Sequence, residues 1–127
     1  ATFRDRACEY ARTTMEIRKI NDDYAVSAQI NPEDIAEIKA AGYRSIICNR
    51  PDDEQPGQPS AQEIAVAAAA ADLIFRHIPF VGGQMTDDDV RKMAEALDEI
   101  PGPVFAFCRS GARSTNIYAA AQQTKRD

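Results

Sequence analysis

The sequence has no tryptophan, one histidine and three cysteines among its 127 residues. The cysteines, Cys8, Cys48 and Cys108, are odd in number and widely spaced, so they do not form a disulfide framework and fit a reducing cytoplasm. One histidine and no closely spaced cysteine pair argue against a zinc site. No glycine-rich run ends in Gly-Lys-Ser or Gly-Lys-Thr, which argues against nucleotide binding of the P-loop kind. We therefore expect neither a metal nor a cofactor.

The chain also lacks long apolar runs and an excess of positive charge. No apolar run approaches the ~20 residues of a membrane span, and no apolar N-terminal segment suggests a signal peptide. Lys and Arg number 15 against 20 Asp and Glu, which gives a net charge of −5. We therefore expect a cytoplasmic protein that binds neither nucleic acid nor membrane, in which local groups must hold any anionic substrate.

The length is that of one domain with one sizeable core. Residues 1–14 are polar, rich in arginine and without a core-facing pattern, so we interpret them as an upstream or disordered extension. The single domain is then expected to span residues 15–127.

Short apolar segments alternate with helical patterns along the domain. Strands are predicted at residues 17–20, 24–29, 44–49, 73–79 and 103–107, and helices at residues 32–41, 61–71, 87–100 and 113–123. This alternation predicts a three-layer α/β fold, with a mainly parallel sheet flanked by helices. Sites in such sheets form beyond the carboxyl ends of the strands, where Cys108, Asn49-Arg50 and residues 81–83 should converge.

The most informative stretch runs from Pro103 to Ser114. It reads as an apolar strand, a loop of small residues that Cys108 opens and Arg113 closes, and a helix that begins near Ser114. That order places a thiol beside a ring of backbone N–H groups, the positive end of a helix and a guanidinium. Each of these features stabilises a thiolate, so we expect Cys108 to be a nucleophile near neutral pH.

The neighbours of Cys108 suggest how an anion would be held. The guanidinium of Arg113 can bind two oxygens of an anion. Ser114 either donates a hydrogen bond to the thiolate or caps the helix. The backbone N–H groups of the loop complete the site, and glycine allows the positive φ that such a ring needs. The loop residues are Arg109, Ser110, Gly111 and Ala112.

Several stretches together resemble a known family. They are Asn49 to Glu54 (NRPDDE) after a strand, Gln55 to Ser60, Arg76-His77-Ile78-Pro79, and the run Pro-Val-x-x-x-Cys-Arg-Ser-Gly-x-Arg-Ser. From about Met15 to Gln122 the chain resembles the beta-lactamase-hydrolase-like protein, phosphatase-like domain family. The resemblance implies a dual-specificity- or tyrosine-phosphatase-like fold with an active cysteine at Cys108. Members occur alone or fused to sulfide-metabolising enzymes, which implies a sulfide-metabolising partner enzyme.

Two features depart from cysteine phosphatases. Those enzymes have five residues between cysteine and arginine, usually with a preceding histidine, whereas this chain has four residues and Phe107. Four is the spacing of rhodanese-type sulfurtransferases. Phosphatases of this fold also place an aspartic acid after the Ile-Pro strand, where this chain has Val81-Gly82-Gly83. Such an acid is worth ~10²–10⁴ in rate, and carboxylates at a helix N-terminus, such as Asp87 to Asp89, make poor acids.

Sulfur transfer needs no such acid, because sulfite or a thiolate leaves readily from a sulfane sulfur. We therefore predict a sulfurtransferase that carries a persulfide on Cys108, with thiosulfate or a persulfide as the small anionic substrate and a thiol as acceptor. The alternative is a phosphatase that hydrolyses phosphomonoesters through a phosphocysteine. A third interpretation is an inactive domain that binds an anion or a partner protein.

Four accessory residues remain open, namely Asn49, Arg50, Cys48 and His77. Arg50 either steers the anionic substrate or pairs with Asp52, Asp53 or Glu54. If its strand neighbours that of Cys108, as the resemblance implies, Cys48 resolves a persulfide or forms a protective disulfide; otherwise it is a small buried hydrophobe. His77 is interpreted as a partly exposed strand residue, with contact to the site as the alternative.

Overall fold

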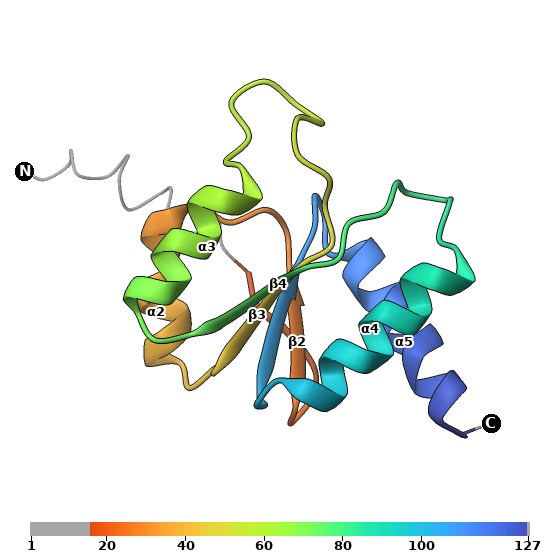
Figure 1. Cartoon of the computed structure of the whole chain (residues 1–127). Helices are drawn as coiled ribbons and strands as arrows, with labels where there is room; N and C mark the ends of the chain where they lie inside the picture. Colours follow the sequence, from red (N-terminus) through yellow and green to blue (C-terminus); the bar gives the residue numbers. More distant parts are fainter. Residues whose placement is uncertain (1–15, 127) are drawn as a thin grey trace, which may run out of the picture.

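One mixed sheet organises the domain. The computed structural model describes residues 16–126, and its five strands lie in the order β1-β2-β5-β3-β4. They are β1 (Arg18–Asn21), β2 (Tyr24–Ser27), β3 (Ser45–Cys48), β4 (Ile74–His77) and β5 (Val104–Phe107). Only β1 runs antiparallel to its neighbour, so four adjacent strands are parallel. Their carboxyl ends therefore meet at one edge, the upper edge in Figure 1.

Helices cover both faces of this sheet. The 3-10 turn Pro32–Asp34, α2 (Ile35–Ala40) and α3 (Ala61–Ala70) lie on one face, and α4 (Asp87–Glu99) and α5 (Ala112–Arg126) on the other (Figure 1). Each helical layer packs on its own apolar cluster. The predicted three-layer α/β fold with a mainly parallel sheet is confirmed.

The central strand β5 shows why its sequence is apolar throughout. Phe105 and Phe107 belong to the cluster beneath α2 and α3, whereas Val104 and Ala106 belong to the cluster beneath α4 and α5. Successive side chains of a strand point to opposite faces, so a strand covered on both sides needs apolar residues at every position. Cys108 follows at the carboxyl end of this buried strand.

Side chains cap the starts of α3 and α4. Ser60 Oγ accepts a hydrogen bond from Glu63 N at 3.1 Å, and Thr86 Oγ1 accepts one from Asp89 N at the same distance. The Asp89 carboxylate accepts the Thr86 N–H in return at 2.9 Å, which completes a capping box. The last helix is longer than predicted, since it begins at Ala112 and continues to Arg126.

The extension predicted at residues 1–14 lies outside the described residues. Within residues 16–126 no helix combines the length and apolar character that crossing a membrane requires.

Candidate active site

Cys108 follows β5 directly and begins the anion loop, the name used below for residues 108–113. The Gly111 N–H donates a hydrogen bond to Cys108 Sγ at 3.1 Å. Gly111 makes this possible with a φ of +99°, which side-chain-bearing residues rarely adopt. Cys108 itself is fully buried. The thiol therefore lies in a buried backbone turn, as the sequence predicts, and Cys108 belongs to neither of the two apolar clusters.

Further backbone donors surround the start of α5. The Ala112 N–H donates to Ser110 Oγ at 3.2 Å, and the Thr115 N–H donates to Gly111 O at 3.0 Å. Between them, the N–H groups of Arg113 and Ser114 have no acceptor among residues 16–126. Unpaired N–H groups at the positive end of a helix are suited to an anion.

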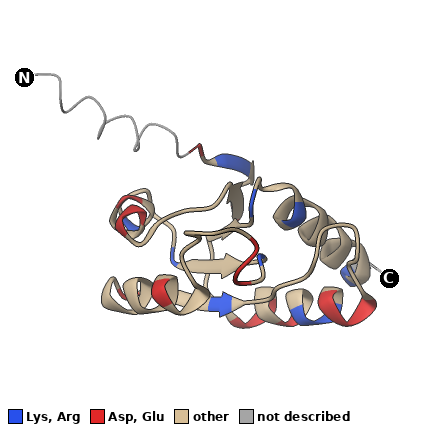
Figure 2. Cartoon of the chain, turned by 90° about the horizontal axis from the view of Figure 1, so that it is seen from above, with Lys and Arg blue, Asp and Glu red and all other residues tan. Residues whose placement is uncertain are grey.

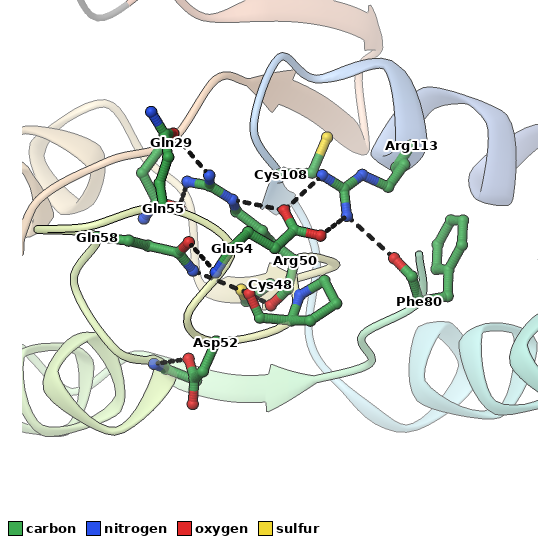
Figure 3. Close-up of polar contacts among 12 residues, drawn as sticks. Gln29, Cys48, Arg50, Asp52, Glu54, Gln55, Gln58, Phe80, Cys108 and Arg113 are labelled. Carbon is green, nitrogen blue, oxygen red and sulfur yellow. Dashed lines mark hydrogen bonds and ion pairs between the residues drawn. The ribbon is translucent and has the colours of Figure 1, made fainter. Parts of the chain in front are cut away.

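The guanidinium of Arg113 already holds a carboxylate. Arg113 Nη1 and Nη2 donate to Glu54 Oε2 and Oε1 at 2.9 and 2.8 Å, and Nη1 also donates to Phe80 O at 3.0 Å (Figure 3). These hydrogen bonds to Arg113, with a further one to Arg50, lower the pKa of Glu54 to about 2, and the Glu54 carboxylate in turn raises the pKa of Arg113. Glu54 is therefore ionised at neutral pH.

Arg50 binds the same carboxylate from the other side (Figure 3). Its side chain is only 2% exposed, and its Nε donates to Glu54 Oε1 at 2.9 Å. Nη1 and Nη2 donate to Gln29 Oε1 and Gln55 Oε1 at 2.9 and 2.8 Å. A buried guanidinium needs such partners. The sequence predicts that Arg50 either steers an anionic substrate or pairs with a nearby acidic residue. In the structure it forms an ion pair with Glu54.

Ser114 and Asn49 connect the ends of neighbouring elements. Ser114 Oγ donates to Asn49 Oδ1 at 2.8 Å, and Asn49 Nδ2 donates to Ile78 O at 3.0 Å. The Asn49 N–H donates to Phe107 O at 2.9 Å. All three contacts are buried, so Asn49 ties the end of β3 to β5, α5 and the residue after β4. The Ser114 hydroxyl donates its hydrogen bond to Asn49 and not to Cys108, whereas the sequence left a hydrogen bond to the thiolate and a helix cap as alternatives.

Cys48 and His77 both contact the backbone of Arg50. Cys48 Sγ lies 3.4 Å from Arg50 O, and burial raises the pKa of this thiol to about 12. Cys48 is thus protonated at neutral pH, which favours the buried-hydrophobe interpretation over a resolving thiol. His77 is exposed on β4, and its Nε2 lies 2.9 Å from Arg50 O. No hydrogen bond joins either side chain to Cys108 in the described part of the chain.

The chain is similar in sequence to a known family of proteins. The model of the family described as beta-lactamase hydrolase-like protein, phosphatase-like domain, matches residues 16–125. The chain belongs to this family. It is 35% identical over 108 residues to beta-lactamase hydrolase-like proteins of Agrobacterium fabrum and Xylella fastidiosa, an alignment that covers 85% of this chain. The chain spans about a quarter of the length of these curated relatives, since the alignment covers 25% of each.

Solved structures agree with the family. A putative phosphatase (nma1982) from Neisseria meningitidis is 30% identical, with a TM-score of 0.75 over 80% of this chain and 72% of that one. A putative phosphatase (DUF442) from Shewanella putrefaciens has a TM-score of 0.78 at 16% identity, over 91% of this chain and 73% of that one. At that identity the likeness shows the fold alone. The resemblance seen in the sequence is thus confirmed, and the fold is phosphatase-like.

Residues 81–83 follow the Ile-Pro strand, where phosphatases of this fold are expected to carry an acid. In this phosphatase-like domain the segment lies beside Arg113. Phe80 O accepts from Arg113, and a Cβ on Gly82 would lie 3.9 Å from Arg113 Nε. Val81, Gly82 and Gly83 supply no carboxylate there. Asp88 pairs with Arg91 and Lys92, and Asp89 belongs to the cap of α4. Glu54 is instead the carboxylate that contacts Arg113.

The predicted meeting of Cys108, Asn49-Arg50 and residues 81–83 is confirmed by these contacts, whereas three other contributors were not predicted. The sequence suggests Glu54 only as one of several partners for Arg50. Gln29 was not considered, although it follows β2, whose carboxyl end adjoins that of β5. Arg18 donates to Ser110 O at 3.2 Å from the antiparallel strand β1, a placement without any local signal.

Proposed function

We propose that the phosphatase-like domain is a cysteine-dependent phosphatase that hydrolyses phosphomonoesters at Cys108. The observation that carries this proposal is the Gly111 N–H donated to Cys108 Sγ at 3.1 Å, beside the unpaired N–H groups of Arg113 and Ser114. The family and its phosphatase-like relatives support it. The comparisons thus favour phosphate chemistry over the sulfur transfer that the sequence analysis preferred.

The proposed reaction has two steps. The Cys108 thiolate attacks phosphorus, the P–O bond to the leaving group breaks, and the departing oxygen takes the electron pair. Water then cleaves the phosphocysteine, releasing phosphate and regenerating the thiol. The loop amides and Arg113 stabilise the charge that develops on the phosphoryl oxygens.

The groups near Arg113 also bear on the substrate class. The 81–83 segment supplies no acid, and Glu54 is ionised, so neither protonates the leaving oxygen in the described state. A leaving group that is stable as an anion needs this help least. Aryl phosphates are therefore the expected substrates, in preference to alkyl phosphates.

The test compares two assays on the purified domain. One measures phosphate release from p-nitrophenyl phosphate, and the other measures thiocyanate formed from thiosulfate and cyanide. We expect phosphate release that is lost in Cys108→Ser and retained in Cys48→Ser, a matched change of a second buried cysteine among the described residues. Thiocyanate without phosphate release would contradict the phosphatase proposal.

Sulfur transfer remains the second candidate, on one specific observation. Four residues separate Cys108 from Arg113, the spacing that resembles rhodanese-type loops, and a shorter loop has fewer amides for a phosphoryl group. Here the thiolate would attack the sulfane sulfur of thiosulfate, sulfite would leave with the S–S electron pair, and a thiol or cyanide would take the sulfur. Intact mass after mixing with thiosulfate would then show one sulfur added to Cys108. If neither phosphate nor thiocyanate forms, the anion- or partner-binding interpretation is favoured.

A further inference from the structure

The contact between Glu54 and Arg113 uses the two terminal nitrogens of the guanidinium, a fork that can also hold two oxygens of an anionic substrate. Both carboxylate oxygens accept from the two terminal nitrogens of Arg113, at 2.9 and 2.8 Å. A phosphoryl or sulfonate group would present two oxygens to the same nitrogens in the same way. In the described state, therefore, an internal carboxylate fills the place of the external anion.

The carboxylate is also held from behind. Arg50 binds Glu54 at 2.9 Å and is itself fixed by Gln29 and Gln55 in a buried setting. The loop of residues 49–60 carries Glu54 over the carboxyl ends of the strands, and Figure 2 shows acidic residues of this loop above the sheet. Glu54 can release Arg113, but Arg50 keeps its negative charge close to any anion that takes its place.

Burial of Cys108 also indicates that the surroundings of the site must move before an anion can bind. Cys108 has no exposed surface, so no substrate reaches its sulfur until part of the surroundings moves. Glu54 is 24% exposed at its side chain and Arg113 is 14% exposed. Their ion pair joins the 49–60 loop to α5 at the site, and it is the contact that an incoming anion would replace.

We propose that Glu54 is the specificity-determining residue of this site: a substrate anion that binds the terminal nitrogens of Arg113 displaces the Glu54 carboxylate and then remains beside its negative charge. The inference rests on the anion site of the proposed function, although it does not require turnover. Its consequence is discrimination by charge. The native site opposes a dianion more strongly than a monoanion, since the repulsion from Glu54 scales with the charge of the ligand.

The decisive variant is Glu54→Gln, which removes the charge, keeps the shape and leaves an amide oxygen that can still accept from Arg113. We would titrate wild type and variant with sulfate, a dianion, and with nitrate, a monoanion, at constant ionic strength. NMR signals of the Gly111 amide report binding. We expect sulfate affinity to rise at least tenfold, and nitrate affinity to rise by a smaller factor.

Asp53→Asn is the matched control, because it makes the same charge change one residue away. Asp53 has a φ of +59°, which asparagine also adopts readily. Sulfate affinity should stay within twofold of wild type. If sulfate affinity rises equally in Glu54→Gln and Asp53→Asn, net charge explains the effect and the proposal is overturned. An equal rise in nitrate and sulfate affinity in Glu54→Gln would also overturn it.

Unchanged or weaker sulfate binding in Glu54→Gln would show that Glu54 positions Arg113, which also overturns the proposal. If Glu54→Gln does not fold, Glu54→Asp shortens the reach to Arg113 and should tighten sulfate at least threefold; no tightening refutes the idea. The two proposals fail separately. If Glu54→Gln binds sulfate more tightly but wild type does not hydrolyse p-nitrophenyl phosphate, only the phosphatase proposal is refuted. If wild type hydrolyses it and the sulfate affinity of Glu54→Gln is unchanged, only the proposed role of Glu54 is refuted.

Discussion

Gly111 provides a sharp test of how the anion loop is built, through the substitution Gly111→Ala. Two effects compete. The residue has a φ of +99°, and forcing a residue with a Cβ into left-handed backbone costs about 1–2 kcal/mol. The new Cβ would also clash with the Nη2 of Arg18 and lie 3.4 Å from Ser27 O.

The steric effect should be the smaller one. The Arg18 nitrogen is the far end of a flexible, exposed side chain, and its movement costs one exposed hydrogen bond to Ser110 O, worth about 0.5 kcal/mol. The contact with Ser27 O requires at most a small adjustment. We therefore predict a total loss of about 1.5–2.5 kcal/mol, set mainly by the backbone, and a melting temperature lower by about 5–10 °C.

Urea unfolding of wild type, Gly111→Ala, Arg18→Ala and the double variant measures each contribution. The cost of Gly111→Ala should agree within about 0.5 kcal/mol in the two backgrounds, because the backbone term does not depend on Arg18. If the cost disappears once Arg18 is shortened, the clash and not the positive φ is responsible, and the reasoning is wrong. Anion binding should fall in both backgrounds, since the displaced N–H is the one that Cys108 accepts.

Three further predictions concern the polar groups around the site. Glu54 has a folded pKa of about 2, below its unfolded value of 4.5, so its contribution to stability is full above pH 4.5 and is lost as the pH falls through 2. For this partly exposed group we expect about 1 kcal/mol, visible as a shallower acid slope of unfolding free energy in Glu54→Gln. Ser114→Ala should lower the free energy of unfolding by about 1–3 kcal/mol in urea unfolding, because it leaves the buried Asn49 Oδ1 without its donor. The control Thr115→Val, on the same helix but only partly buried, should lower it by less. Arg50→Met should cost about 2–4 kcal/mol by the same assay, since Gln29, Gln55 and Glu54 lose a shared buried partner, and a loss below 1 kcal/mol would show that the cluster is not structural.

The sequence predicts those parts of the domain that depend on neighbouring residues. The Cys108 turn, the caps at Ser60 and Thr86 and the alternation of strands and helices all follow from residues within one segment. Strand order does not, because β5 is apolar on both faces and its pattern does not say which strands flank it. The sequence leaves the Ser114 hydroxyl between the Cys108 thiolate and a helix cap, since its acceptor in the structure, Asn49, lies 65 residues away.

The choice of Glu54 among three consecutive acidic residues also has a physical explanation that only the folded loop reveals. The Asp52 carboxylate accepts the Ala61 N–H at 2.8 Å, so it serves the start of α3. Asp53 occupies left-handed backbone at a φ of +59°, which turns the chain. Glu54, four residues after Arg50, is the acidic residue that contacts Arg113, 59 residues away in the sequence.

This arrangement gives the short anion loop its particular dependence on one side chain. With four residues between Cys108 and Arg113, the loop has fewer backbone donors than the five-residue loops of cysteine phosphatases, so under the proposed function we expect the guanidinium to supply a larger share of the anion's binding. The same guanidinium is the one that Glu54 holds with two hydrogen bonds. A longer loop could bind an anion largely through its amides and tolerate such a carboxylate. In this domain the competition between Glu54 and the ligand for Arg113 should instead control whether an anion reaches Cys108 at all.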